Sequence, residues 1–461
     1  MVDSLFKRLR SREVLHRSWA AVKQSGLLSP SEETSRAIKR YDANSLSNIE
    51  KLGKRLRADT FCFDGEQGIT VPKKGKKRSA GVRPIVLAPI DNRIVRRAIL
   101  EVLQGYGTEE PSSQKRWPGV PAVVRIMETR TSVGGIKCRG VPHGLALIDE
   151  AVHSGKTWFV RSDIKNFFTH IPLKDVNAFI AQAVDDRQFA ELFSCALDTN
   201  LVNQAELEER NEFKLFPDHD VGVAQGSALS ALAANITLRD FDEKMNGRGI
   251  TCIRYIDDFI ILGQTPDKAR AAYASARKHL ASMGMDVYEY TDSAARCDGK
   301  FDEGNIYQGT DILGYRVSGH SRQPSLTAQR AFLKKCDTLV ENAEKDMRLA
   351  ASGQPPSQGF CYHQAMVLLH KTARGWSHAF KHTTANLVFK SLDEEIGRRI
   401  EKLRHFAQGL TRGAPEEVRR RVMGIQLLAD TPPHALPDIP QPVQISSCSE
   451  GDRLEGIASA A

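Results

Sequence analysis

The sequence predicts an α+β fold followed by a mainly helical C-terminal region, and three observations support this prediction. Between residues 157 and 317, short runs of β-branched and aromatic residues alternate with longer stretches of helical periodicity. Residues 326–408 then have an almost entirely helical pattern. The chain of 461 residues, 41% of them hydrophobic, is long enough to bury a large core in two or three domains.

The first 90 residues are expected to form helices and then a hairpin. In residues 1–58, charged residues alternate with Leu, Ile and Ala, which indicates an N-terminal helical extension. The run Ser-Pro-Ser-Glu-Glu at 29–33 contains side chains that commonly cap a helix N-terminus. Apolar runs at 69–72 and 84–90 flank a strongly basic loop, a pattern that predicts a hairpin with a cationic tip.

The remaining elements divide the chain into a mixed region, a helical region and a tail. Short strand-like runs lie at 157–161, 251–255, 259–263 and 312–317. Helix-like stretches lie at 174–200, 227–245 and 266–283. We therefore predict an N-terminal extension, a mixed domain, a helical domain and a flexible tail, with the ranges 1–58, 59–325, 326–410 and 411–461.

Charge and cysteine content narrow the classes of function. Lys and Arg number 65 against 56 Asp and Glu, and the formal charge of +9 favours a polyanionic partner such as nucleic acid. The eight cysteines include no CxxC pair, which argues against a disulfide framework or a structural zinc site. No apolar stretch has the length of a signal peptide or a membrane span, so we expect a cytoplasmic protein without a membrane partner.

The sharpest feature is the pair of adjacent acids in Tyr255-Ile256-Asp257-Asp258, which lies between two apolar runs. A surface turn can also contain adjacent acids, but polar residues usually bracket such a turn, so the tip of a β-hairpin is the better interpretation. A third acid, Asp163, ends the strand-like run at 158–162. Carboxylates at the ends of adjacent strands could converge on two Mg²⁺ ions, for which Mn²⁺ can substitute. Two such ions stabilise the attacking and leaving oxygens of a phosphoryl transfer.

Three blocks of the sequence resemble the ordered palm motifs of reverse transcriptases. They are Ser-Asp-Ile-Lys-Asn-Phe-Phe at 162–168, Ala-Gln-Gly-Ser-Ala-Leu-Ser at 224–230 and Tyr-Ile-Asp-Asp at 255–258. The resemblance implies a right-hand polymerase, in which residues 59–325 form fingers and a palm with an antiparallel sheet and residues 326–410 form a helical thumb.

By this resemblance, Asp163 and Asp257 are the principal metal ligands. The carbonyl group of Ile164 assists them, and Asp258 is a weaker ligand. All three aspartates are therefore the expected catalytic residues.

The resemblance also implies residues that bind the incoming nucleotide. Phe168 takes the position of the steric gate, whose ring excludes a ribose 2′-OH, so the expected substrate is a dNTP. Phe167 and Phe168 could instead be a core pair, or one of them could be core and the other the gate. Gln225 and Gly226 correspond to the segment that lines the nucleotide and the template base, with a turn at a helix start as the alternative.

The basic loop and the strand after it resemble the fingers motif of bacterial reverse transcriptases, which binds the triphosphate. Lys73 and Arg83 take the roles of the two cations that bind the triphosphate. The neighbouring lysines are alternatives for that role or contacts of the template backbone, although a solvated charge run is the simpler interpretation for each. These lysines are Lys74, Lys76 and Lys77, and Arg78 is a further alternative to Lys73.

Further segments extend the resemblance over roughly residues 60–405. The glycine-rich run at 132–140 resembles the segment before the first palm motif, and Ile-Leu-Gly-Tyr at 312–315 resembles the strand near the primer grip. Residues 373–380 resemble the thumb of group II intron enzymes, where Trp376 and Phe380 are expected to pack at i,i+4. The expected basic face of the thumb contains Arg398, Arg399, Lys402 and Arg404, with an ordinary solvated helix face as the alternative.

Within the family, the chain resembles stand-alone bacterial enzymes related to group II intron and retron polymerases. This implies an RNA template, a DNA product and dNTP substrates, and it suggests a dedicated noncoding RNA and a role in antiviral (anti-phage) defence. A template-independent or protein-primed DNA polymerase has the same palm chemistry, so this alternative stays open. An RNA-binding intron maturase or scaffold is the non-enzymatic alternative, and the oligomeric state stays open as well.

Overall fold

The computed structural model describes most of the chain, and its compact part divides into two units. The first unit comprises Met1–Lys334 with Trp376–Glu394, and the second comprises Lys335–Gly375 with Glu395–Ala461. The described residues are 4–29, 31–72, 81–107, 116–218, 220–247, 249–357, 359–384, 386–425 and 427–428.

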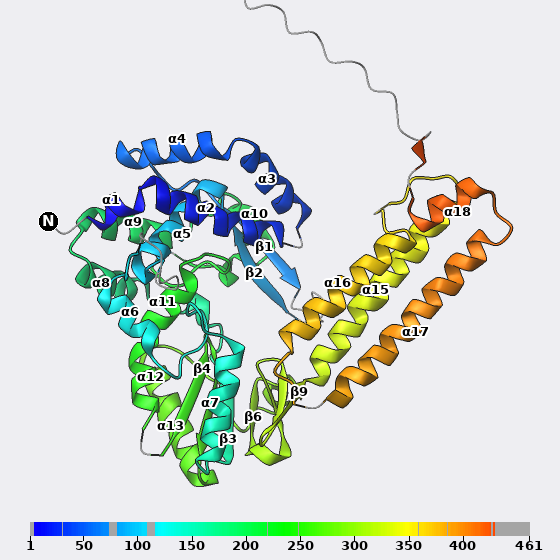
Figure 1. The fold of residues 1–461 in the computed structure, drawn as a ribbon. Helices are drawn as coiled ribbons and strands as arrows, with labels where there is room; N and C mark the ends of the chain where they lie inside the picture. Colours follow the sequence, from blue (N-terminus) through cyan, green and yellow to red (C-terminus); the bar gives the residue numbers. More distant parts are fainter. Residues whose placement is uncertain are drawn as a thin grey trace, which may run out of the picture. The chain divides into compact units, whose positions relative to one another are not determined.

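Four helices precede the first strand, which confirms the expected helical extension (Figure 1). They are α1 (Leu5–Leu9), α2 (Arg12–Leu27), α3 (Glu32–Ala43) and α4 (Ser45–Arg57). The hydroxyl of Ser31 accepts a hydrogen bond from the Thr34 amide at 3.2 Å, so the predicted cap does begin α3.

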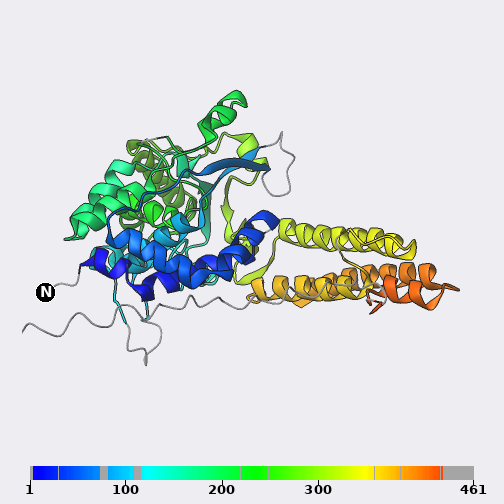
Figure 2. The same ribbon diagram turned by 90° about the horizontal axis from the view of Figure 1, so that it is seen from above.

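The predicted hairpin is confirmed as two antiparallel strands, β1 (Gln67–Pro72) and β2 (Val82–Leu87). Helix α5 (Ile90–Gln104) follows directly, and its buried side chains pack against α2. Figure 2 shows the two strands as a ribbon, with the connecting tip outside the described residues.

The central sheet of the first unit is antiparallel, with strand order β4-β5-β3-β6. The pattern at 157–161 becomes β3, and those at 251–255 and 259–263 become β4 and β5, whereas β6 was not predicted. The strands are β3 (Trp158–Asp163), β4 (Thr251–Tyr255), β5 (Asp258–Gly263) and β6 (Phe301–Asn305).

Both faces of this sheet are covered by helices. Phe259 and Ile261 point toward α13 (Pro266–Ser282) and join the larger core. Ile260 and Leu262, which alternate with them, join a second core with α7 (Val141–His153). This double burial explains why β5 has a continuous apolar run rather than an alternating pattern.

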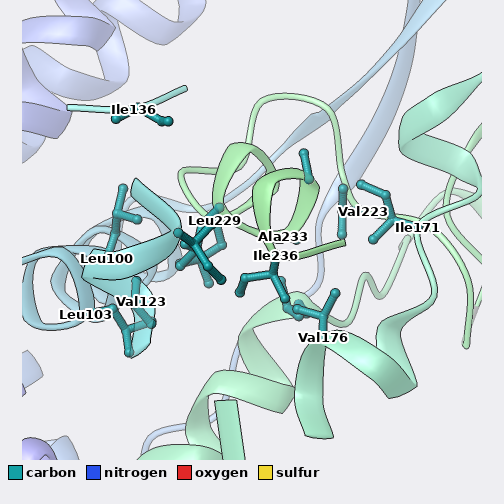
Figure 3. Close-up of a cluster of buried hydrophobic side chains, with 14 of the residues drawn as sticks. Leu100, Leu103, Val123, Ile136, Ile171, Val176, Val223, Leu229, Ala233 and Ile236 are labelled. Carbon is teal, nitrogen blue, oxygen red and sulfur yellow. The ribbon is translucent and has the colours of Figure 1, made fainter. Parts of the chain in front are cut away.

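The larger core is built around α11 (Ser230–Thr237). Figure 3 shows Leu229, Ala233 and Ile236 of this segment among side chains from neighbouring helices, including Leu103 and Val176. The neighbouring helices are α5, α6 (Pro121–Glu128) and α8 (Leu173–Ala183). Nearly every residue of α11 is buried. The N-terminal end of this helix is therefore a fixed anchor for the segment that precedes it in the chain.

Three sequence predictions differ from the structure in their details. The stretch at 174–200 is two helices, α8 and α9 (Arg187–Leu197), because Asp186 caps α9 through the Phe189 amide at 3.0 Å. The stretch at 227–245 is α11 followed by α12 (Arg239–Met245). The run at 312–317 is a tight hairpin rather than one strand, because Leu313 and Gly314 have φ values of 52° and 84°.

The remaining elements of the first unit are short. The hairpin just described joins β7 (Thr310–Ile312) to β8 (Tyr315–Ser318), which pairs with β9 (Ser321–Pro324). The other short elements are α10 (Gln204–Glu209), α14 (Ser293–Cys297), and the 3₁₀ helices η2 (Phe167–Thr169), η3 (Phe213–Leu215) and η4 (Ile306–Gln308).

Long helices dominate the C-terminal region, as predicted. These are α15 (Leu326–Ala351), α16 (Tyr362–Ala379) and α17 (Asn386–Thr411), which run alongside one another (Figure 1, Figure 2). A further helix, α18 (Glu416–Met423), lies in the range expected to be a flexible tail, and it buries Val422. No helix in the described part of the chain is both long enough and apolar enough to cross a membrane.

Candidate active site

The sheet brings the three predicted aspartates to one edge. Tyr255 and Asp258 are partners in the β4–β5 hairpin, so Ile256 and Asp257 form its two-residue turn, as the sequence predicted. Asp258 also pairs with Asp163 across β5 and β3. The Ile164 amide donates to the Asp257 carbonyl at 3.0 Å, which fixes the end of β3 against this turn. We call residues 255–258 the carboxylate turn.

The negative charges of the carboxylates in this turn are poorly balanced by cations and hydrogen-bond donors. Burial raises the pKa of Asp258 to about 6; the charge of Arg161, 4.0 Å away, opposes this shift, and that of Asp257 adds to it. Burial also raises the pKa of Asp257, against the charges of Arg83 and Arg254. Oδ1 of Asp258 is buried and has no hydrogen-bond partner among the described residues. Such a buried, unsatisfied oxygen favours binding of a cation.

Asp163 has a cationic partner. The ammonium group of Lys300, which follows α14, donates to Oδ2 of Asp163. Lys300 lies 137 residues further along the chain, and neither Lys300 nor Arg161 was predicted from the sequence to belong to the site. A signal for Arg161 exists, since it is a charged residue inside the otherwise apolar run of β3.

The donor set fits hard divalent cations such as Mg²⁺. Within the described ranges, no group of three or more His, Cys, Asp or Glu side chains forms a complete metal-binding set. Mg²⁺, however, is commonly bound by one or two carboxylates, with water and substrate phosphates completing its coordination. Asp163 and the carboxylate turn, in which Oδ1 of Asp258 has no hydrogen-bond partner among the described residues, match that arrangement.

The structure gives Phe167 and Phe168 different environments. Phe167 is buried in the larger core, whereas Phe168 is only partly buried, with its ring centroid 5.7 Å from that of Phe167. The carbonyl of Phe168 accepts a hydrogen bond from the Val223 amide at 2.8 Å. Phe168 therefore lies beside the segment that leads to Gln225 and remains available as the gate.

Gln225 and Gly226 connect this segment to the fingers hairpin. The Val86 amide of β2 donates to the Gln225 carbonyl at 3.2 Å, and Gly226 has a φ of 108°, which favours glycine. Arg83 is exposed on the same strand, β2, and its charge acts on the pKa of Asp257. The structure thus places Gln225 and Gly226 against the strand that carries Arg83, and the charge of Arg83 acts on Asp257.

The glycine-rich run has a role that its sequence did not reveal. A Cβ atom on Gly134 would lie 2.5 Å from the amide nitrogen of Ile256, closer than any real contact. The run also joins the hairpin through the Val133 amide, which donates to the Arg254 carbonyl at 2.8 Å. Gly134 is therefore required for close packing against the carboxylate turn.

The basic residues differ more from expectation. Lys73, Lys74, Lys76 and Lys77 lie outside the described residues. On α17, Arg399 is only 16% exposed and binds Asp337 at 2.7 Å and Glu395 at 2.8 Å, so it does not present the free cation that we expected.

The other cations expected on the basic face of α17 also have acidic neighbours, although they are more exposed, and Arg404 pairs with Glu401 at 2.6 Å. Arg398 pairs with Glu395 at 2.9 Å and Lys402 with Glu344 at 2.9 Å. The expected packing of Trp376 and Phe380 is confirmed, with their ring centroids 4.7 Å apart.

A palm-like sheet with convergent carboxylates at one edge defines a nucleotidyltransferase type of site. The profile of the family "Reverse transcriptase (RNA-dependent DNA polymerase)" matches residues 71–289, which contain all three aspartates. Residues 71–289 therefore match the reverse transcriptase domain that the motifs predicted.

Comparisons with individual proteins and structures give low sequence identity and partial coverage. The "uncharacterized 91 kDa protein in cob intron" of Schizosaccharomyces pombe is 25% identical over 202 residues, which are 44% of this chain and 21% of that protein. A structure of telomerase from Candida albicans in complex with a telomeric RNA fragment covers 82% of this chain and 67% of its own, with 12% identity and a TM-score of 0.39. A partial Cas6-RT-Cas1–Cas2 complex covers 61% and 43%, with 18% identity and a TM-score of 0.30. The chain thus spans about a fifth of the curated relative.

Proposed function

We propose that this protein is an RNA-directed DNA polymerase that synthesises cDNA from dNTPs. The observation that carries the proposal is the register of β3 against β5, which places Asp163 opposite Asp258 and beside Asp257 within a reverse transcriptase domain. Hard cations held by this site would supply activation of a primer 3′-OH and neutralisation of charge on the leaving pyrophosphate. Asp163 and Asp257 would hold them, with the Ile164 carbonyl and Asp258 as auxiliary ligands.

The other residues of the site orient the nucleotide. Arg83 is suited to gripping the triphosphate in bidentate fashion, because its guanidinium is exposed near Asp257. The ring of Phe168 would exclude a 2′-OH, and the backbone at Gln225 and Gly226 would line the base pair. Lys73 belongs to the proposal by family resemblance alone.

The test is DNA synthesis by the purified protein. We expect incorporation of labelled dNTPs on a primed RNA with Mg²⁺ or Mn²⁺, and none with Asp257→Asn. Product sequencing separates the alternatives, because a copy of the RNA indicates templating, whereas a homopolymer indicates template-independent synthesis. Absence of incorporation on any primed RNA would favour a maturase or scaffold.

The finer part of the proposal is a dedicated noncoding RNA template and a cytoplasmic role in anti-phage defence. It is supported by the resemblance to stand-alone bacterial enzymes. Sequencing the RNA and DNA that co-purify with the protein tests the template. Phage plating on cells carrying Asp257→Ala tests the defence role, which is contradicted if plating is unchanged from the wild type.

A further inference from the structure

The carboxylate turn is held in an unfavourable backbone conformation. Ile256 has a φ of 61°, a left-handed value that β-branched residues rarely adopt. A residue in such a conformation persists only when its surroundings impose it, and such residues concentrate at functional sites. The neighbours of Ile256 should therefore include the group that imposes it.

Arg254, two residues earlier on β4, contacts Ile256 with a side chain that is completely buried. Its Nη1 donates to the carbonyl oxygen of Ile256 at 2.9 Å. Its Nε donates to Asp242 of α12 at 2.7 Å, and Nη2 contacts the other oxygen of the same carboxylate. One guanidinium thus joins the strained residue to a buried carboxylate.

The same guanidinium reaches two further segments. Nη2 donates to Ser132 at 2.8 Å and to Asn235 of α11 at 3.0 Å. Asn235 in turn donates to the Gly134 carbonyl at 3.1 Å, in the run that packs against the carboxylate turn. Ser132, Asn235 and Asp242 are all buried. This network therefore connects the turn to α11, a helix that is enclosed in the larger core.

We propose that Arg254 is a positioning residue that holds Ile256 in its left-handed conformation and so places Asp257 beside Asp163. The proposal rests on the proposed function for its catalytic consequence but not for its structural one. A buried ion pair is weak evidence for stability, because apolar residues of similar size often serve as well. What apolar residues cannot supply is a donor to the Ile256 carbonyl.

The test variant is Arg254→Lys, which keeps the charge for Asp242 but loses the planar fork of five donors. The matched control is Arg96→Lys. Arg96 is also buried, contacts the Glu66 carboxylate and donates to the carbonyls of Ala196 and Asp198 at 2.8 and 3.2 Å, but it contacts no residue of the carboxylate turn. The same chemical change is thereby made at two buried arginines, and only one of them holds the turn.

We expect Arg254→Lys to lower kcat by about 100-fold, because a misplacement of about 1 Å costs that much, with little change in the KM for dNTP. Hydrogen exchange of peptides spanning 251–262 should become faster in this variant. Arg96→Lys should leave both kcat and this exchange unchanged. Equal kcat losses in the two variants, or unchanged exchange in a folded Arg254→Lys protein, would overturn the proposal.

Rescue separates positioning from general damage. Glycine adopts a positive φ without strain, so Ile256→Gly in the Arg254→Lys background should restore a large part of kcat. Failure of this rescue in a folded protein contradicts the proposal. If Arg254→Lys does not fold, Ser132→Ala carries the test, since it removes one acceptor and leaves the Asp242 pair. Faster exchange and a smaller kcat loss are then expected, and wild-type values for both overturn the proposal.

The two proposals fail in different ways. A wild-type protein without DNA synthesis contradicts the proposed function, whereas the exchange measurement still decides the role of Arg254. A wild-type protein that synthesises DNA, with Arg254→Lys indistinguishable from it, contradicts only the positioning role.

Discussion

The carboxylate turn and helix α17 organise charge in opposite ways. At the turn, Asp257 and Asp258 lie close together, and one buried oxygen of Asp258 has no partner within the described part of the chain. On α17, Arg399 is bound by Asp337 and Glu395. A buried charge without a counter-charge is energetically unfavourable and indicates that a ligand binds there. A charge that is paired with opposite charges, as Arg399 is, contributes to the stability of the fold. Substitutions should therefore affect chemistry at the turn and stability on the helix.

The largest effect is expected from Asp163→Asn or Asp257→Asn. Loss of a metal-binding carboxylate removes several kcal/mol of transition-state stabilisation, so DNA synthesis should fall by about 1,000-fold or more. Steady-state incorporation measures this loss, with thermal unfolding as the control for folding. Activity within tenfold of the wild type would contradict the role of the turn.

The next effect is a change of substrate preference in Phe168→Ala. Removing the partly buried ring should reduce discrimination against rNTPs by about 10- to 200-fold, the range for one steric group in a binding pocket. The ratio of kcat/KM for dNTP and rNTP measures it. Phe167→Leu is the matched control, because Phe167 is buried in the core and should affect the free energy of unfolding rather than the ratio.

Arg83→Ala should raise the KM for dNTP by about 10- to 100-fold, because a hydrogen bond to a charged group contributes about 1.5–3 kcal/mol. Arg83 is exposed, so its removal should leave the melting temperature unchanged. A KM equal to that of the wild type would exclude Arg83 from triphosphate binding.

The smallest effect on activity is expected from Arg399→Ala. Loss of its two ion pairs should lower the free energy of unfolding by about 1–3 kcal/mol, between the values for exposed and buried pairs. Affinity for a primed RNA, measured by fluorescence anisotropy, should stay close to that of the wild type. A large loss of affinity without a loss of stability would mean that Arg399 binds nucleic acid and does not stabilise the fold, which contradicts the contrast between the two regions.

The sequence predicted the local features of the site because its motifs are local. The hairpin around Asp257 and Asp258 follows from two acids between apolar runs, and the end of β3 at Asp163 follows from one strand-like run. These features need no knowledge of distant contacts. Strand β6 was missed because its residues, Phe-Asp-Glu-Gly-Asn, are mostly polar and become a strand only through pairing with β3.

Other features depend on residues far apart in the sequence. The break between α8 and α9 occurs at Asp186, which also accepts a hydrogen bond from the Phe6 amide at 2.9 Å, 180 residues earlier. The pairing of Lys300 with Asp163 and that of Arg399 with Asp337 are likewise tertiary. A charged side chain gives no sign in the sequence of whether a distant partner will neutralise it.

The position of β3 in the middle of the sheet also has a consequence for synthesis on the ribosome. Both neighbours of β3 come later in the chain, since β5 ends at Gly263 and β6 at Asn305. While the intervening residues are translated, β3 has two unpaired edges, which are templates for non-native strand pairing. The three aspartates can therefore meet only after more than half of the chain has been made, and translation that pauses between β3 and β6 should favour aggregation of the nascent chain.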